Sequence, residues 1–131
     1  MSFVLDASAV LALVHSEPGA ESVADALRDS VMSTVNWAEV VARVRGDATN
    51  GAGAGPSALR LELCALGFRL EEFSAEQADL AGELRRSTRD FGLSLGDRAC
   101  LALALVRSEP VLTADRVWQR LSLDVEIEVI R

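Results

Sequence analysis

The chain has 131 residues, of which 50% are apolar and 25% charged, and its 13 basic and 20 acidic residues give a formal net charge of −7. This composition can form one buried core, which excludes a disordered chain, and the longest apolar run, Ala99–Val106, is far shorter than the roughly 18 to 20 residues of a membrane span. Taken alone, the negative charge argues against a polyanion partner such as nucleic acid, because phosphate is repelled on average.

The amino-terminal segment is predicted to be a strand followed by two helices. Phe3–Leu5 is a short apolar run that Asp6 ends, which predicts a buried strand. The apolar segment Ala7–His15 then has the length and pattern of a buried helix. A Pro-Gly pair interrupts the pattern, and Ala20–Asp29 carries apolar side chains on one side, which predicts an amphipathic helix.

The next segment repeats the order of strand and helix. Val31–Val35 predicts a short strand, and Asn36–Arg45 predicts a helix with valines on its apolar face. Gly46 is expected to end that helix. The segment Gly46–Gly55 is rich in Gly and Ala without an apolar anchor, which predicts a mobile surface loop whose role is open, and a further helix is expected to begin at Pro56.

The middle of the chain predicts a strand and a long helix. Arg69–Phe73 has the composition of a strand. Ser74, with Gln77 three residues later, forms the pattern of a capping box, and the helix that it opens is expected to extend to Asp90. Phe91–Leu95 is then a connecting loop.

A second capping box, formed by Ser94 and Asp97, opens the most apolar helix of the chain. Its segment Ala99–Val106 is expected to be buried nearly all round. After Pro110, the residues Val111–Thr113 predict another strand.

The carboxyl-terminal segment completes the pattern. Asp115 can cap a short helix that extends to Leu121, and Val125–Ile130 alternates apolar and acidic residues as a half-exposed edge strand does. Strands that alternate with helices predict a parallel sheet with helices on both faces. We therefore expect an α/β fold, a three-layer α/β/α sandwich with a mainly parallel central sheet, in one domain over residues 1–131.

The cysteines and the amino terminus indicate the compartment. Cys64 and Cys100 both fall in apolar helical patterns, which favours buried thiols over a disulfide or a zinc site. The apolar stretch Ala9–Val14 has no basic residue before it, so it does not have the pattern of a secretory signal. We expect a cytoplasmic protein with no membrane segment.

Four acidic residues lie where the predicted strands end or where a buried helix begins: Asp6, Glu39, Asp97 and Asp115. Ligands of parallel sheets bind at the carboxyl ends of the strands, so Asp6, Glu39 and Asp115 are expected to meet at one edge, where Asp97 can join them if its helix starts there. An alternative interpretation is that each of these acids is a helix cap with no further role, because carboxylates are favoured at helix starts. Converging carboxylates would repel one another unless cations neutralise them, and oxygen ligands suit Mg²⁺ or Mn²⁺.

Four segments that contain these acids resemble the acidic motifs of PIN-domain nucleases, most closely the VapC toxins of bacterial toxin–antitoxin pairs. The segments are Val4–Ala9, Asn36–Glu39, Leu93–Ala104 and Leu112–Asp115. The resemblance covers nearly the whole chain in order and spacing, and the segment around Asp97 is the most specific.

The resemblance implies a Mg²⁺- or Mn²⁺-dependent endoribonuclease that cuts structured RNA and forms a homodimer. It also implies a VapB-type antitoxin partner whose carboxyl-terminal segment covers the active site. By matching position, the catalytic metal site would be formed by Asp6, Glu39, Asp97 and Asp115. Ser8 and Thr113 match hydroxyl positions that could orient a ligand or a water.

Positive charge for an RNA substrate has to come from arginine, because all 13 basic residues are arginines. Arg98 and Arg116 each follow one of the four acids and are candidates for RNA contact. Arg85 and Arg86 are better explained as surface charge at a helix end. Trp37 could stack on a base, although such a tryptophan more often packs in the protein.

Two other functions are compatible with parts of the pattern. A catalytically silent PIN-like module would bind a partner protein through the same fold. An aspartyl-phosphate phosphatase would also place an acid such as Asp6 after its first strand. The absence of lysine from the chain and of a second aspartate from Asp6-Ala7-Ser8 argues against that phosphatase.

Overall fold

The computed structural model describes residues 2–47 and 55–131, and within them the core element is a five-stranded sheet. The strands are β1 (Val4–Leu5), β2 (Val31–Ser33), β3 (Arg69–Glu71), β4 (Val111–Thr113) and β5 (Ile127–Val129). Their order is β3-β2-β1-β4-β5, and each neighbouring pair is parallel. The central strand is β1, since Val4 pairs with both Val31 and Val111.

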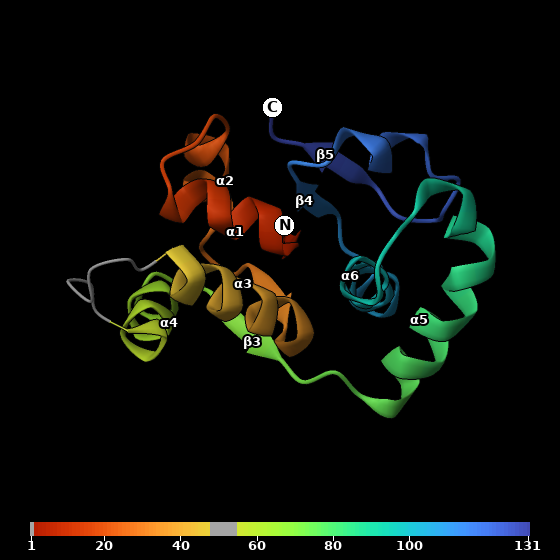
Figure 1. Ribbon diagram of the computed structural model, residues 1–131, viewed down its shortest axis with the longest axis horizontal. Coiled ribbons are helices and arrows are strands. Elements are labelled where there is room, and N and C mark those ends of the chain that lie inside the picture. Colours follow the sequence, from red (N-terminus) through yellow and green to blue (C-terminus); the bar gives the residue numbers. More distant parts are fainter. Residues whose placement is uncertain (1, 48–54) are drawn as a thin grey trace.

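Helices cover both faces of this sheet (Figure 1). The helices are α1 (Ala7–Val14), α2 (Ala20–Ala26), α3 (Thr34–Asp47), α4 (Pro56–Ala65), α5 (Ala75–Thr88) and α6 (Leu95–Arg107). Two 3₁₀ turns, η1 (Arg89–Phe91) and η2 (Arg116–Arg120), follow α5 and β4. The structure therefore confirms the predicted three-layer α/β/α sandwich.

The two faces of the sheet follow from the alternation of side chains along each strand. The first residues of the three inner strands, such as Val4, join the core cluster formed by α5, α6 and Trp118 of η2. The second residues, such as Leu5, join the cluster formed by α1 to α4. Trp37 belongs to the second cluster, where its ring lies 6.0 Å from that of Phe68, so it is a packing residue.

Several predicted boundaries differ from the structure. The strand predicted over Val31–Val35 ends at Ser33, because the Ser33 hydroxyl accepts a hydrogen bond from the Val35 N–H and α3 begins at once. The helix predicted over Ala20–Asp29 ends at Ala26. Gly46 does not end α3, which continues to Asp47, and residues 48–54 of the predicted loop lie outside the described part of the chain.

The two predicted capping boxes have different outcomes. Ser94 and Asp97 exchange both hydrogen bonds, so the start of α6 is a complete capping box. Ser74 caps α5 by accepting from the Gln77 N–H, but the Gln77 side chain donates to Glu71 instead of returning to Ser74. The box at α5 is therefore only half formed.

The cysteine prediction is half wrong. Cys100 is fully buried in α6, whereas Cys64 is exposed on α4. The residue before it, Leu63, is the buried residue of α4, and successive side chains of a helix point about 100° apart. Both thiols are free.

None of the described helices is long and apolar enough to cross a bilayer.

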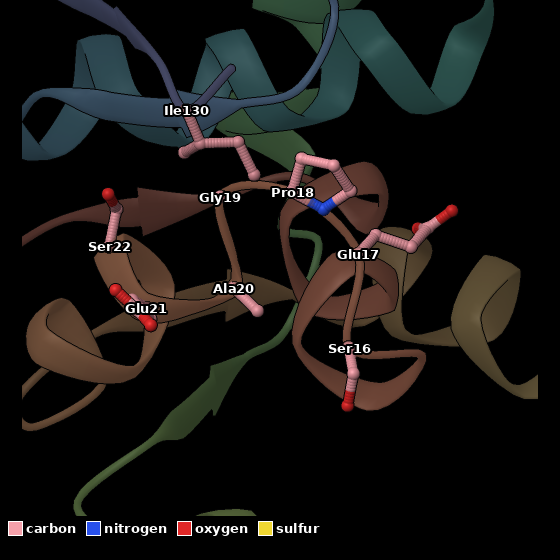
Figure 2. A pocket seen from close by; sticks show the side chains of 8 residues that line it. All are labelled: Ser16, Glu17, Pro18, Gly19, Ala20, Glu21, Ser22 and Ile130. Atoms are coloured by element: carbon pink, nitrogen blue, oxygen red, sulfur yellow. The ribbon is translucent and has the colours of Figure 1, made fainter.

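The turn between α1 and α2 requires a glycine. Gly19 has a φ of +95°, and a Cβ there would lie 2.7 Å from Cγ1 and 2.8 Å from the backbone oxygen of Ile130. Figure 2 shows Ile130 beside this turn. In contrast, Gly82 lies within α5, and a Cβ there would meet nothing within 4 Å.

These two glycines should respond oppositely to the same substitution. Gly19→Ala should lower the free energy of unfolding by roughly 1 to 3 kcal/mol, through the positive φ and the contact with Ile130. Gly82→Ala should raise it by up to about 1 kcal/mol, because alanine favours the helix. Urea denaturation measures both, and an equal effect of the two substitutions would contradict this account.

Candidate active site

Asp6 lies where the central strand β1 ends and α1 begins, and it is the N-cap of α1. Its Oδ1 accepts hydrogen bonds from the Ser8 hydroxyl at 2.7 Å and from the Ala9 N–H at 2.9 Å. Its Oδ2 accepts from the Thr113 hydroxyl at 2.7 Å. The residue is only 5% exposed. A buried carboxylate with three donors is held in one orientation.

The two hydroxyls beside Asp6 join it to the end of β4. The Ser8 hydroxyl also accepts from the Ala114 N–H at 2.9 Å, and the Thr113 hydroxyl accepts from the Asp115 N–H at 3.0 Å. Each hydroxyl therefore donates to Asp6 and accepts from the backbone that follows β4. In this structure both hydroxyls orient the Asp6 carboxylate.

Burial dominates the electrostatics of Asp6 and raises its pKa from 3.8 to about 6. The hydrogen bonds from Ser8, Thr113 and Ala9 act in the opposite direction, because they stabilise the ionised form. The negative charge of Asp97 raises the pKa further. Ionised Asp6 is thus costly in the free protein, and a nearby positive charge would relieve that cost.

Glu39 lies in the second turn of α3, with its carboxylate against the start of α6. The side-chain amide of Asn36 donates to Glu39 Oε1 at 2.9 Å. A Cβ built on Gly96 would lie 2.6 Å from Cδ of Glu39, so the carboxylate occupies the space beside that glycine. Because α3 begins at Thr34, Glu39 is past the capping position, and capping does not explain it.

Asp97 lies in the first turn of α6, directly after Gly96. Its Oδ2 accepts from the Ser94 N–H at 3.0 Å, so the capping interpretation holds for this residue. Its charge also acts on the buried Cys100, together with those of Asp6 and Glu39. Burial is the main cause of the raised pKa of the Cys100 thiol, and these three acids raise it further. The charges of three of the four predicted acids therefore act on the same buried thiol of α6.

Asp115 is linked to Asp6 indirectly. It is exposed and caps η2, with its Oδ1 accepting from the Val117 N–H at 3.0 Å. Among the described residues, its link to Asp6 passes through the Thr113 hydroxyl. It lies at the end of β4, beside β1, as the parallel topology requires.

The donor set contains oxygen ligands, which fit a hard divalent cation such as Mg²⁺ or Mn²⁺. The four acids do not form a closed metal site in this structure. Within residues 2–47 and 55–131, no three His, Cys, Asp or Glu side chains are grouped so that they could hold a metal ion. Asp97 and Asp115 are both engaged in helix caps. Each cap uses one carboxylate oxygen, Oδ2 of Asp97 and Oδ1 of Asp115, so a cation could be bound by the second oxygen of either side chain.

The two arginines predicted to contact RNA have different surroundings. Arg98 points back to α5, where its Nη1 donates to the Ala81 carbonyl at 2.8 Å and its Nε is buried. This packing role argues against the predicted RNA contact of Arg98. Arg116 is exposed after Asp115, and its Nε donates to the backbone oxygen of Arg131 at 2.9 Å.

Figure 2 shows a pocket at the turn between α1 and α2. Its lining runs from Ser16 to Ser22 and includes Ile130, and it contains none of the four acids.

The sequence places Asn36 at a helix start and in the segment Asn36–Glu39, but its contacts were not predicted. Asn36 is 1% exposed, and its Nδ2 donates both to Glu39 Oε1 and to the Gly96 carbonyl, each at 2.9 Å. The signal that could have indicated the first bond is the spacing, because residues i and i+3 are neighbours on a helix.

The raised pKa of Asp6 predicts a pH-dependent effect of Asp6→Asn in chelator. The neutral form of Asp6 stabilises the fold fully below about pH 3.8, and this contribution is lost as the pH rises through about 6. The variant should therefore gain stability relative to the parent between pH 4 and pH 7, by at most about 3 kcal/mol. Urea denaturation across that range measures the difference, and a parent that gains on the variant as the pH rises would contradict the assignment.

Known proteins match this fold and sequence over most of their length. Residues 3–123 match the family model of the PIN domain. Ribonuclease VapC42 of Mycobacterium tuberculosis and a VapC ribonuclease of Mycobacterium bovis are each 34% identical to the chain, and each match covers 83% of this chain and 87% of the relative.

Solved structures share the fold at low sequence identity. The DNA-bound VapBC of Salmonella typhimurium has a TM-score of 0.73 at 15% identity, over 100% of this chain and 99% of that chain. VapBC2 of Rickettsia felis, bound to a promoter DNA fragment, has a TM-score of 0.72 at 17% identity, over 98% of both chains. The family match and the curated relatives confirm the resemblance stated above: the chain belongs to the PIN-domain family, in its VapC branch.

Proposed function

We propose that this chain is a Mg²⁺- or Mn²⁺-dependent endoribonuclease toxin that hydrolyses RNA phosphodiester bonds with water as the nucleophile. The observation that carries the proposal is the position of Asp6. It is buried at the carboxyl end of the central strand, and the negative charge of Asp97 raises its pKa. The name ribonuclease of both curated relatives supports the same reaction.

The proposed catalytic cation ligands are Asp6, Glu39, Asp97 and Asp115. A bound divalent cation supplies Lewis-acid chemistry, which polarises a phosphodiester and lowers the pKa of water. The protein contributes orientation: Ser8 and Thr113 fix the Asp6 carboxylate, and Asn36 fixes that of Glu39. With a pKa of about 6, Asp6 is already mostly ionised at pH 7 and needs no proton acceptor before it binds a cation.

An acidic chain can bind RNA if cations concentrate at the site. Two divalent ions would change the formal charge from −7 to −3, and that change would fall where the phosphate has to bind. Arg116 is exposed next to Asp115 and is the arginine best placed to meet a phosphate. Arg98 is tied to α5 and is left out of this proposal.

The partners follow from the solved relatives. The structures from Salmonella typhimurium and Rickettsia felis are of VapBC, and that from Klebsiella pneumoniae is of a toxin–antitoxin complex. We infer a VapB-type antitoxin and a homodimer for this chain, which would act in the cytoplasm.

A catalytically silent PIN-like module is the second candidate. The absence of a grouped set of three ligands among the described residues is the observation that favours it. An aspartyl-phosphate phosphatase has no such support, because the chain contains no lysine.

Cleavage of total RNA by the purified protein tests the reaction. Asp6→Asn and Asp97→Asn should each lower the rate by about 100-fold or more, because each removes a ligand oxygen, and chelator should abolish cleavage in the parent. As a control, Asp124→Asn changes an exposed acid in the segment before β5, and this variant should cleave RNA as the parent does. Full activity in both site variants would contradict the proposal.

Calorimetric titration with Mn²⁺ separates the two candidate functions. The parent should bind Mn²⁺ with measurable heat, and Asp6→Asn should bind at least about 10-fold more weakly. A blank titration of folded parent protein would favour the silent binding module.

A further inference from the structure

We propose that Asn36 is a positioning residue, whose buried side-chain amide holds the Glu39 carboxylate against Gly96 and thereby sets the position of Glu39 relative to Asp97. The inference rests on the proposed function, since it treats Glu39 and Asp97 as cation ligands.

The geometry of the Asn36 amide joins two helices at one point. Its Nδ2 donates to Glu39 Oε1 on its own helix and to the Gly96 carbonyl at the start of α6, both at 2.9 Å. Both hydrogens of the amide nitrogen are therefore used. Because Asp97 is the next residue after Gly96, the two bonds relate the Glu39 carboxylate to the backbone that carries Asp97.

Gly96 provides the space that this arrangement needs. A Cβ at position 96 would lie 2.6 Å from Glu39 Cδ and 2.8 Å from Glu39 Oε2. Any other residue there would displace the carboxylate. The amide of Asn36 and the missing side chain of Gly96 thus act on the same carboxylate from two sides.

The buried Asn36 amide has both satisfied and unsatisfied polar atoms. Asn36 is 1% exposed, and its Oδ1 is buried without a hydrogen-bond partner among the described residues. A buried acceptor without a partner costs folding free energy, and a leucine of similar size would avoid that cost. The leucine would also remove the donor to Glu39 Oε1 and to the Gly96 carbonyl, so the substitution removes the bonds that hold Glu39.

The chain offers a matched control in Gln77. Its amide is also buried, at 3% exposed, and its Nε2 donates to a carboxylate, Glu71, at 2.9 Å. Its Oε1 is likewise buried without a partner. The two amides differ in the carboxylate to which they donate, because Glu39 is one of the four predicted acids and Glu71 is not.

The experiment compares Asn36→Leu with Gln77→Met, each of which replaces an amide by an apolar side chain of similar size. In calorimetric titrations, Asn36→Leu should weaken Mn²⁺ binding by roughly 10- to 100-fold, because orienting partners of metal ligands have effects of that size. Gln77→Met should leave the Mn²⁺ affinity within about twofold of the parent, since it touches no proposed ligand. Parent-like affinity in Asn36→Leu, or an equal loss in Gln77→Met, would overturn the proposal.

Gly96→Ala tests the same arrangement without removing a donor. The clash is with the end of a flexible side chain, so the variant is expected to fold and to displace only the Glu39 carboxylate. Its Mn²⁺ affinity should fall as in Asn36→Leu. Unchanged affinity in folded Gly96→Ala would show that this placement of Glu39 is not needed.

A double-mutant cycle keeps the inference testable even if the parent binds no Mn²⁺, a result that would count against the proposed function. In chelator, Glu39→Ala should shift the urea midpoint by different amounts when residue 36 is Asn and when it is Leu. An asparagine at position 36 donates a hydrogen bond to Glu39, and a leucine there cannot. Equal shifts in both backgrounds would mean that Asn36 does not hold Glu39 and would overturn the inference by itself.

Discussion

The burial of one carboxylate at the end of the central strand is the constraint on which the site depends. Asp6 is ionisable, almost inaccessible to water and satisfied by three donors from two segments of the chain. A carboxylate in that position needs those donors, since an unsatisfied buried charge would destabilise the fold. The hydroxyls of Ser8 and Thr113 therefore belong to the fold as much as to the site.

A second constraint acts where α3 meets α6. The helix α6 begins with a capping box that uses Asp97, and its Gly96 leaves room for an acid of α3. Two acids thus reach the same place from separate helices, one through a cap and one through a buried amide. At this junction Asp97 both caps α6 and brings a negative charge close to Glu39.

Much of this arrangement could be predicted from local patterns. Asp6 ends an apolar run, and the spacing of Ser94 and Asp97 indicates a capping box; both features depend on neighbouring residues and were confirmed. The contact of Asn36 with Gly96 joins residues 60 positions apart, and no local pattern carries it. The orientation of Arg98 toward α5 could not be predicted either, because a side chain's direction depends on which helix packs beside it.

The bond between Thr113 and Asp6 joins residues 107 positions apart, and this has a consequence for synthesis on the ribosome. The central strand emerges first, but its neighbour β4 is among the last strands to be made. Parallel strands cannot pair until the whole crossover between them has been translated. A nascent or truncated chain that lacks β4 therefore lacks the Thr113 donor to Asp6, and the site is completed only after β4 has been translated.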